Sequence, residues 1–273
     1  MASTLNDIEK TALRAARSAG RIHLARLQRV NVSRKTSAID LVTEADHESE
    51  AAIIQILSRA YPTHTIVAEE TGGIVKDGEH RWIIDPLDGT TNFAHGFPQF
   101  CTSIGYERRG QMTLGVVYDA LKKECFTARR GKGAFLNGKR IRVSDTPSLD
   151  FSLLGTGFPY DRRQRRRYYF TFWEAFMMKV QGVRRTGSAA LDLAYVACGR
   201  VDGFWEFGLK SWDVAAGSLI IEEAGGRVTN MDGSPLALDG GRILASNRLL
   251  HDQMVTTMAE TEDEARRRQA EIE

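Results

Sequence analysis

The sequence predicts a mixed α/β protein, in which helical and strand segments alternate along 273 residues. Apolar residues recur at helical spacing in some segments and as short continuous runs in others, which are the patterns of buried helices and strands. The dipeptide Asn137-Gly138 is a strong signal for a hairpin turn. Hydrophobic residues make up 42% of the chain and charged residues 26%, so the composition is that of a globular protein and does not indicate disorder.

Two helices are predicted near the N-terminus. In residues 4–29 the residues at helical spacing are Leu5, Ile8, Ala12, Ala15, Ala16, Ile22 and Leu24. In residues 44–59 the inward positions are Ala52, Ile53, Ile56 and Leu57. The segment 31–39 between them is polar and has no pattern, which predicts a surface loop.

The rest of the chain divides into a strand-rich and a helix-rich part. Strands are predicted between residues 64 and 128, including 100–107 and 112–118, and a strand with a tight turn over 131–138. Helices are predicted near 162–178, 188–198, 211–224 and 247–270. Residues 260–273 are charged throughout, so we expect them to fray into solvent.

Length, charge and cysteine content limit the class of protein. A chain of this length folds as one large domain or two small ones. The net charge of +2 gives no general attraction to nucleic acid. Three cysteines without C-x-x-C spacing, no secretory or transit signal and no long apolar span predict a cytoplasmic protein.

The segment 82–92 carries the clearest chemical signal. Its apolar run ends in Asp85 and Asp88, followed by a glycine and two threonines. A buried strand can carry its terminal acids to the rim of a sheet. Pro86 stiffens the turn, and Gly89 allows a close approach or a positive φ. A metal ion or an oxyanion would fit there.

A structural turn remains the alternative, because an Asx turn needs no ligand. An EF-hand loop is excluded. Counted from Asp85, its third position is Leu87 and its sixth is Thr90, where such a loop requires an oxygen ligand and a glycine.

Two further acidic segments raise the case for a site. In residues 66–73, a short apolar run ends in Glu69 and Glu70, and glycines follow. Downstream, a helical stripe consists of Trp212, Ala215, Ala216, Leu219 and Ile220. Ser211 suits its N-cap and Gly225 its C-terminal stop. Asp213 then lies in the first turn, where the helix dipole alone would also explain a carboxylate.

These motifs resemble, in order, those of the inositol monophosphatase family, within the wider group of lithium-sensitive, Mg²⁺-dependent sugar phosphatases. The matching segments are 40–46, 68–70, 82–93, 187–190, 204–206 and 212–217. The likeness covers almost the whole chain. It implies a layered α/β/α/β/α sandwich and a single domain over 1–273, with an N-terminal half of about 1–145 and a C-terminal half of about 146–273.

The resemblance also implies two or three Mg²⁺ ions, with Mn²⁺ as a substitute. The implied ligands are the carboxylates of Glu69, Asp85, Asp88 and Asp213 and the carbonyl of Leu87. Two carboxylates about 4 Å apart repel by roughly 4 kcal/mol at an effective dielectric near 20, so cations are needed. Oxygen ligands suit Mg²⁺ or Mn²⁺, and no histidine or cysteine pair has zinc spacing.

The implied reaction is attack of water on a phosphate monoester, without a phosphoenzyme. One ion, on Glu69, Asp85 and the Leu87 carbonyl, lowers the pKa of a water molecule. A second ion, on Asp85, Asp88 and Asp213, binds the phosphate and stabilises the departing alkoxide.

Other catalytic roles follow from the same resemblance. Glu69 and Thr90 orient and deprotonate the water, and Asp46 is hydrogen-bonded to Thr90. Backbone N–H groups of Gly89 and Thr90 bind the phosphate oxygens. The loop 31–39, with Lys35, helps to close the site around an additional metal, although a plain surface loop is the alternative.

Substrate contacts are also implied. The substrate-binding residues are Asp88, Gly89, Thr90, Gly187, Ser188, Ala189, Glu206 and Asp213. A carboxylate at Glu206 can accept hydrogen bonds from two vicinal hydroxyls of a polyol. A solvated strand end is the alternative for this residue.

Two clusters of arginines leave other roles open. Arg184 and Arg185 could bind a second phosphate or belong to an interface. Residues 162–167 contain five arginines and precede aromatics, as in nucleic-acid binders. The aromatics are better explained as one buried helix face, comprising Tyr169, Phe172, Trp173, Phe176 and Met177, with Asp161 as the helix cap. An acidic partner, a dimer neighbour or a bound anion stays open for the arginines.

We therefore predict a Mg²⁺-dependent phosphomonoesterase acting on inositol 1-phosphate. The resemblance further implies a homodimer and inhibition by Li⁺. Fructose 1,6-bisphosphatase and nucleotide 3′-phosphatase are the alternative activities. An added RNA- or protein-binding role of the segment from Arg162 to Arg167 is the alternative from another class.

Overall fold

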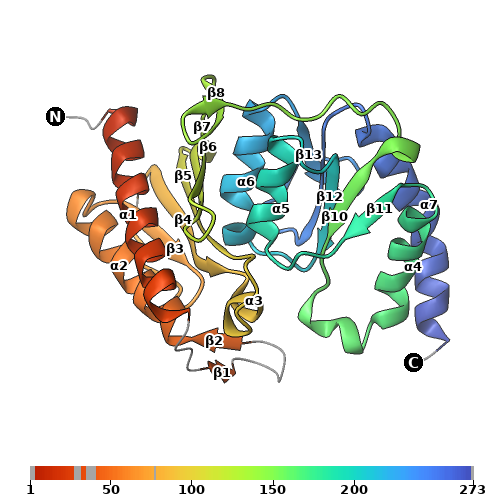
Figure 1. Ribbon diagram of the computed structural model, residues 1–273, viewed down its shortest axis with the longest axis horizontal. Coiled ribbons are helices and arrows are strands. Elements are labelled where there is room, and N and C mark those ends of the chain that lie inside the picture. The colour runs from red at the N-terminus through yellow and green to blue at the C-terminus, as the bar shows by residue number, and fades with distance from the viewer. Residues whose placement is uncertain (1–3, 28–31, 35–40, 77, 272–273) are drawn as a thin grey trace.

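The structure, a computed structural model, describes residues 4–27, 32–34, 41–76 and 78–271. It consists of five layers in which pairs of helices alternate with two sheets (Figure 1). The outer pairs are α1 (Leu5–Arg26) with α2 (Glu44–Ala60) and α4 (Arg166–Met177) with α7 (His251–Ala270); the central pair is α5 (Ala189–Ala197) with α6 (Ser211–Glu223). The predicted α/β/α/β/α sandwich is confirmed.

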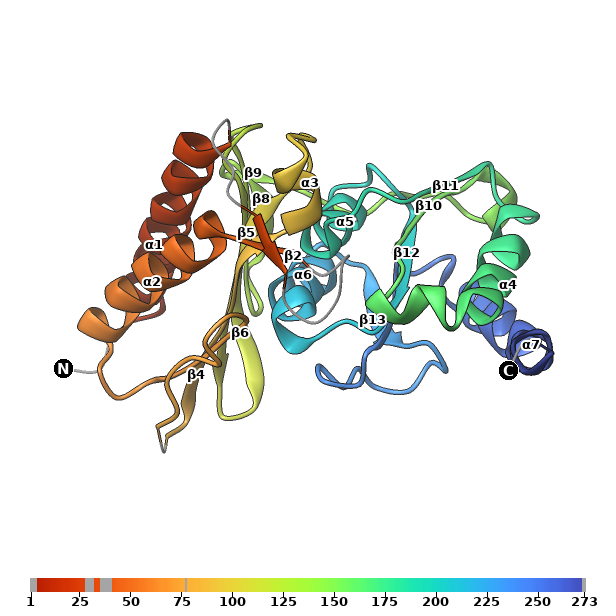
Figure 2. The ribbon, with the colours of Figure 1, turned by 90° about the horizontal axis from the view of Figure 1, so that it is seen from below.

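The first sheet has seven strands in the order β3-β4-β5-β6-β7-β8-β9. They are β3 (Thr65–Ala68), β4 (His80–Asp88), β5 (Cys101–Arg108), β6 (Gln111–Asp119), β7 (Glu124–Arg129), β8 (Gly133–Leu136) and β9 (Lys139–Arg140). Only β3 and β4 are parallel neighbours. Helices α1 and α2 cover one face of this sheet and α6 the other (Figure 2).

The second sheet has five strands in the order β11-β10-β12-β14-β13. They are β10 (Leu153–Thr156), β11 (Gly182–Arg184), β12 (Gly203–Phe207), β13 (Arg227–Asn230) and β14 (Arg242–Ser246). Strand β10 is parallel to both β11 and β12. The segments that follow these three strands therefore leave the sheet at the same edge, which is where ligands bind in sheets with parallel strands.

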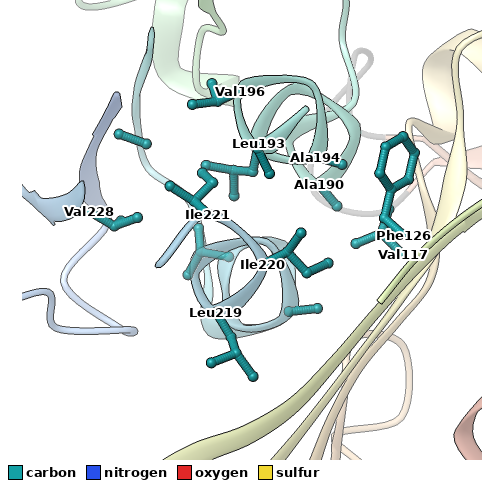
Figure 3. Packing of buried hydrophobic residues seen from close by; sticks show 14 of the residues in the cluster. Val117, Phe126, Ala190, Leu193, Ala194, Val196, Leu219, Ile220, Ile221 and Val228 are labelled. Carbon is teal, nitrogen blue, oxygen red and sulfur yellow. The ribbon is translucent and has the colours of Figure 1, made fainter. Parts of the chain in front are cut away.

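The central helices are buried from both sides. Apolar residues of α5 and α6 such as Leu193 and Ile220 meet Val117 and Phe126 of the first sheet and Val228 of the second (Figure 3). Since α6 is apolar around most of its circumference, the stripe predicted from its sequence is only part of its buried surface. This packing fixes the N-termini of α5 and α6 between the two sheets.

Several helix ends differ from the prediction. Residue Ser211 is the first residue of α6, and its cap is Lys210, whose backbone N–H donates to Asp213. Asp161 does not cap α4, which begins at Arg166 after a short 3₁₀ helix, η2 (Tyr160–Arg163). Instead, Asp161 accepts a hydrogen bond from the Tyr169 hydroxyl. The α6 start thus differs by one residue, with a local capping contact, whereas Asp161 has a partner in α4 that its expected role as a cap does not show.

The prediction that residues 260–273 fray is wrong for the described residues up to 271. Helix α7 continues to Ala270 and packs along α4. Its last turns bury Thr261, Ala265 and Gln269, while Arg268 forms an ion pair with Glu174. The charges lie on one face of the helix, and a pattern of small and polar residues forms the buried face.

Two smaller corrections concern the α4 stripe and the N-terminal loop. Tyr169, Phe172 and Phe176 are buried as predicted, but Met177 is 49% exposed. Residues 31–39 are not wholly a loop, because β1 (Val32–Arg34) pairs with β2 (Leu41–Thr43). Among the described residues, no helix is both long enough and apolar enough to cross a membrane.

Candidate active site

A cavity of about 590 Å³ opens between the end of β4 and the edge of the second sheet where β10, β11 and β12 end. Ten of the predicted site residues line it: Glu69, Asp85, Leu87, Asp88, Gly89, Thr90, Gly187, Ala189, Glu206 and Asp213. Residues more than 100 positions apart in the chain thus face one space. Lys35, the remaining loop residue of the prediction, lies outside the described residues.

Three carboxylates form the centre of the cavity wall. One oxygen each of Asp85, Asp88 and Asp213 lies within 4.8 Å of the others, close enough to hold one cation. Asp85 and Asp88 end strand β4, and a bulge between them turns both acids toward the cavity. Asp213 comes from the first turn of α6. The structure therefore brings together acids that the sequence placed at two separate element ends.

Each carboxylate is oriented by neighbouring backbone or hydroxyl groups. Asp88 Oδ2 accepts hydrogen bonds from Ser188 Oγ at 2.6 Å and from the Ala190 N–H at 2.8 Å. Asp85 Oδ1 accepts from the Leu87 N–H at 2.9 Å, and Asp213 Oδ2 from the Lys210 N–H at 2.6 Å. In each case one oxygen is held by a hydrogen bond from the protein.

The mutual repulsion of these groups is visible in their pKa values. Burial, followed by the charges of Glu69, Asp88 and Asp213, raises the pKa of Asp85 well above its usual range. Burial also raises the pKa of Asp88, against the lowering effect of its hydrogen bond from Ser188. Groups of acids with raised pKa values in one cavity are typical of functional sites, and a divalent cation would relieve their repulsion.

A second set of contacts surrounds Thr90. Its hydroxyl lies 2.9 Å from Asp46 Oδ1 and 3.1 Å from the Leu87 carbonyl oxygen. Asp46 lies behind the cavity wall, where its other oxygen accepts from the backbone and hydroxyl of Thr43 and caps α2. The predicted contact between Asp46 and Thr90 is therefore present.

Gly89 shapes the turn that precedes the short helix α3 (Thr90–Ala94). Its φ is +95°, and a Cβ there would lie 2.8 Å from the Gln99 carbonyl oxygen. A side chain is thus excluded both by backbone conformation and by space. The backbone N–H groups of Gly89 and Thr90 follow directly after Asp88 in this turn.

Glu206 is buried within β12 and not at a solvated strand end, so that alternative is wrong. Burial raises its pKa to about 8, although the charge of Arg185 acts in the opposite direction. A Cβ at Gly157 would lie 2.0 Å from Glu206 Oε1, so the carboxyl group occupies the space above this glycine. Its position in the cavity suits a hydrogen-bond acceptor for substrate hydroxyls.

Comparison with known proteins identifies the group to which this site belongs. A profile of the inositol monophosphatase family matches residues 4–263. The chain belongs to this family. It is 46% identical to inositol-1-monophosphatase of Mesorhizobium japonicum, over 90% of this chain and 92% of that protein. It is 47% identical to the protein called Nus factor SuhB of Pseudomonas aeruginosa, over 90% of this chain and 94% of that protein.

A solved structure supports the same assignment. The inositol monophosphatase from Anabaena (Nostoc) sp. superposes with a TM-score of 0.87 at 45% identity, covering 95% of this chain and 98% of that one. Its similarity extends across both sheets of the sandwich, so the five-layer arrangement is that of the family. Relatives that are about equally identical to this chain have different names. Family membership therefore does not define its activity, which has to be inferred from its own cavity.

Two buried residues of this family member were missed from the sequence. His23 of α1 lies behind the metal-binding turn, where its Nε2 is 3.0 Å from the Pro86 carbonyl oxygen. Glu50 of α2 accepts hydrogen bonds from the backbone N–H groups of Glu70 and Thr71, at 2.7 and 2.9 Å. Each holds a backbone segment beside a cavity carboxylate. His23 interrupts an otherwise apolar face of α1, which was an available signal, whereas Glu50 shares the buried face of α2 with Asp46 and Ser49.

Asn92, which is half-buried, is a third residue that holds backbone beside the cavity. Its amide donates to the carbonyl oxygens of Gln99 and Thr186, at 2.7 and 2.9 Å, and lies 3.2 Å from that of Gly187. The side chain thereby ties α3 to the turn before α5. This contact joins the carboxylate half of the cavity to the half that contains Gly187.

Proposed function

We propose that the protein is a Mg²⁺-dependent phosphomonoesterase that hydrolyses inositol 1-phosphate to inositol and phosphate. The observation that supports this most directly is the cavity in which Asp85, Asp88, Asp213 and Glu69 face Glu206 across a space of about 590 Å³. Relatives 46% and 49% identical to the chain are called inositol-1-monophosphatase. Family, cavity and charge thus favour the same reaction.

The donor set fits Mg²⁺ and, as a substitute, Mn²⁺. All the groups that could hold two or three ions are oxygens, from Glu69, Asp85, Asp88, Asp213 and the Leu87 carbonyl, and such ligands suit hard cations. When bound, the ions supply positive charge for the phosphate and make a nearby water more acidic. Without that charge, the carboxylates would repel a phosphate dianion.

The residues around Thr90 are suited to position the attacking water. The Thr90 hydroxyl donates its proton toward Asp46, so its oxygen would be able to accept a hydrogen bond from a water in the cavity that Thr90 lines. Glu69 lines the same space and would accept the proton of the water. Backbone N–H groups of Gly89 and Thr90 would donate to the phosphate; α3 has only five residues, so these N–H groups matter more than its dipole.

The substrate ring would lie toward the second sheet. Glu206 would accept hydrogen bonds from two ring hydroxyls, and the backbone of Gly187 and Ala189 lines the adjacent wall. Ser188 acts through Asp88, to which its hydroxyl donates at 2.6 Å. In this arrangement the phosphate and the ring bind to opposite halves of the chain.

Phosphate release from three substrates tests this proposal. With Mg²⁺ present, we expect inositol 1-phosphate to have a higher kcat/KM than fructose 1,6-bisphosphate or 3′-phosphoadenosine 5′-phosphate, because Glu206 matches vicinal ring hydroxyls. A chelator should stop the reaction, and Mn²⁺ should restore part of it. Near-equal kcat/KM values for the three substrates would contradict the preference for inositol.

His23 offers a test of how the metal-binding turn is held. The Pro86 carbonyl accepts, so Nε2 carries the proton, while Nδ1 is buried and has no hydrogen-bond partner among the described residues. Replacing His23 by leucine removes the donor, and we expect the Kd for Mg²⁺ to rise about tenfold, as for other residues that orient metal ligands. Replacing it by glutamine retains an N–H of similar reach and should restore most of the affinity.

Titration calorimetry of both variants, with thermal unfolding as a check on folding, measures this effect. A leucine variant with unchanged Mg²⁺ affinity would show that the turn does not depend on this hydrogen bond. Equal losses in both variants would assign the effect to packing against Phe93 and Phe100, whose rings lie 6.0 Å from that of His23.

A second candidate function comes from relatives called Nus factor SuhB. Their names favour a protein- or RNA-binding role in addition to catalysis. The arginines of residues 162–167 give it limited support, because they face different directions. Arg165 lies over the Tyr168 ring, Arg167 pairs with Glu271, and Arg162 lines the cavity. A salt-dependent RNA gel shift, lost on changing these arginines to glutamine, tests this role.

We also propose a single domain for the whole chain, because α5 and α6 share one core with both sheets. The homodimer and the inhibition by Li⁺ stay predictions.

A further inference from the structure

Two guanidinium groups line the cavity in addition to the carboxylates. Arg162 belongs to η2, which follows β10, and Arg185 follows β11 directly. Since β10 and β11 are parallel neighbours, the two segments leave the sheet at the same edge. Both arginines therefore belong to the wall formed by the second sheet, whereas Glu69, Asp85 and Asp88 belong to the first.

Among the described residues, neither guanidinium has an ion-pair partner. Over the described part of the chain, no carboxylate oxygen lies within 4.0 Å of a guanidinium nitrogen of Arg162 or Arg185. Arg162 Nη1 has only a long contact of 3.4 Å to the Pro159 carbonyl oxygen. By contrast, several other arginines of this fold form ion pairs at the surface, as Arg167 and Arg200 do.

The placement of these charges costs free energy in the absence of an anion. Arg162 is partly buried, and its burial, followed by the charge of Arg185, lowers the pKa of its guanidinium. Two cations that face one cavity repel each other, and Arg162 has in addition lost part of its water. An anion bound between them would remove this cost.

The scissile phosphate is not a good candidate for that anion. In the proposed function it lies at Asp85, Asp88 and Asp213, together with the metal ions. The ring would occupy the space beside Glu206. Although burial raises the pKa of the Glu206 carboxyl group, the charge of Arg185 lowers it, so the two side chains are near each other. A group attached to the far side of the ring would then reach the arginines, and the cavity volume of about 590 Å³ is typical of sites that hold a whole ligand of this size.

We propose that Arg162 and Arg185 form a second anion subsite, through which the cavity accepts phosphorylated polyols that carry a second phosphate group. The inference rests on the proposed phosphomonoesterase function and extends it to a substrate class. Arginine suits this role because its planar fork donates two parallel hydrogen bonds to a phosphate. The segment 162–167 thus contributes one residue to the active site, and the others lie outside it.

Pairs of substrates that share one ring and differ by one phosphate group separate the effect of the second phosphate from the effect of the ring. Inositol 1-phosphate is compared with inositol 1,4-bisphosphate, and fructose 1-phosphate with fructose 1,6-bisphosphate. We expect KM to be lower for the bisphosphate in at least one pair. Arg162→Gln and Arg185→Gln should each raise that KM roughly three- to tenfold, as expected for a charged hydrogen bond partly open to solvent.

The decisive quantity is the ratio of kcat/KM for bisphosphate to monophosphate. We expect this ratio to fall in both variants and to fall further in the double variant, with a weaker dependence on salt concentration. Arg163→Gln is the matched control, because Arg163 is an exposed neighbour that does not line the cavity. It should leave the ratio unchanged.

Two outcomes would overturn the inference. An unchanged ratio in both pairs would show that the arginines do not bind a second phosphate. Equal losses on monophosphate and bisphosphate would show that Arg185 acts only by positioning Glu206. Failure of the proposed function is distinguishable, because no substrate would then be hydrolysed; calorimetric binding of the two inositol phosphates with Ca²⁺ present would still measure the preference for the bisphosphate and its loss in the variants.

Discussion

Replacing Asp88 by asparagine is expected to abolish Mg²⁺-dependent phosphate release while leaving the protein folded. Asp88 Oδ2 accepts hydrogen bonds from Ser188 Oγ and the Ala190 N–H, and an amide oxygen can accept both. The amide nitrogen then replaces the oxygen that faces Asp85 and Asp213. Its N–H groups cannot bind a cation, and the loss of about 4 kcal/mol of transition-state stabilisation corresponds to roughly 10³-fold in kcat.

The measurement is phosphate release under saturating Mg²⁺, together with the thermal unfolding temperature. Asp145→Asn is a suitable control, since it removes the same charge from an exposed side chain that does not line the cavity. An Asp88 variant with near wild-type activity would refute the assignment of this carboxylate to the metal site. If this variant fails to fold, Asp213→Asn tests the same assignment, because the carboxylate of Asp213 belongs to the same cluster and comes from α6.

The position of these acids was predictable because local sequence and fold agree there. The run from Trp82 to Ile84 reads as a buried strand, and the strand ends where the acids begin. Asp213 could be placed in the first turn of a helix by the apolar stripe that follows it. The convergence of Asp213 with Asp85 was not derivable from spacing. It depends on α6 packing on the first sheet, and only the family resemblance supplied it.

Other features depended on contacts between distant segments and were missed or misread. The charged C-terminal residues predicted to fray are helical and pack on α4, because Arg268 forms an ion pair with Glu174 and Ala265 is buried. Sequence composition counts the charges but does not show their partners. The arginine run was read as one surface, although Arg162 belongs to a 3₁₀ helix that precedes α4 and lines the cavity. Irregular turns of this kind have no periodicity to detect.

Protons and Mg²⁺ are expected to compete for the same carboxylates. In the absence of Mg²⁺, we expect the free energy of unfolding to fall as the pH rises from 6.5 to 8. Burial raises the pKa of Asp85 and Asp213 in the folded state, and that of Glu206 and Asp192 to about 8. An unfolded chain has lost these protons near pH 4. In this window the folded state therefore binds more protons than the unfolded state, and the free energy of unfolding decreases with pH.

The histidines contribute with the opposite sign, but at lower pH. Burial lowers the pKa of His23, and also of His64 and His251, to about 4 from the ordinary value of 6.5. Unfolded histidines bind protons between these two values, so this contribution to stability is lost as the pH falls below 6.5. Unfolded histidines have lost nearly all their protons by about pH 7.5, so the carboxylates dominate the change in stability toward pH 8.

Mg²⁺ should reverse the trend, because the ion stabilises the deprotonated carboxylates of the folded state. At about 100 times its Kd, a ligand adds roughly 2.7 kcal/mol to the free energy of unfolding. For a chain of this size that corresponds to a rise of roughly 5–10 °C in Tm. We expect the full rise at pH 8 and a smaller one at pH 6.5, where protons must first be displaced.

Thermal unfolding with and without Mg²⁺ at the two pH values, at constant ionic strength, measures this difference. In Asp88→Asn the shift with Mg²⁺ should be small at both pH values, whereas Asp145→Asn should behave as the unchanged protein. The same rise in Tm at pH 6.5 and pH 8 would mean that metal and protons do not share a site. The raised pKa values would then reflect burial of these acids alone, and the cavity would lose its main argument as a cation site.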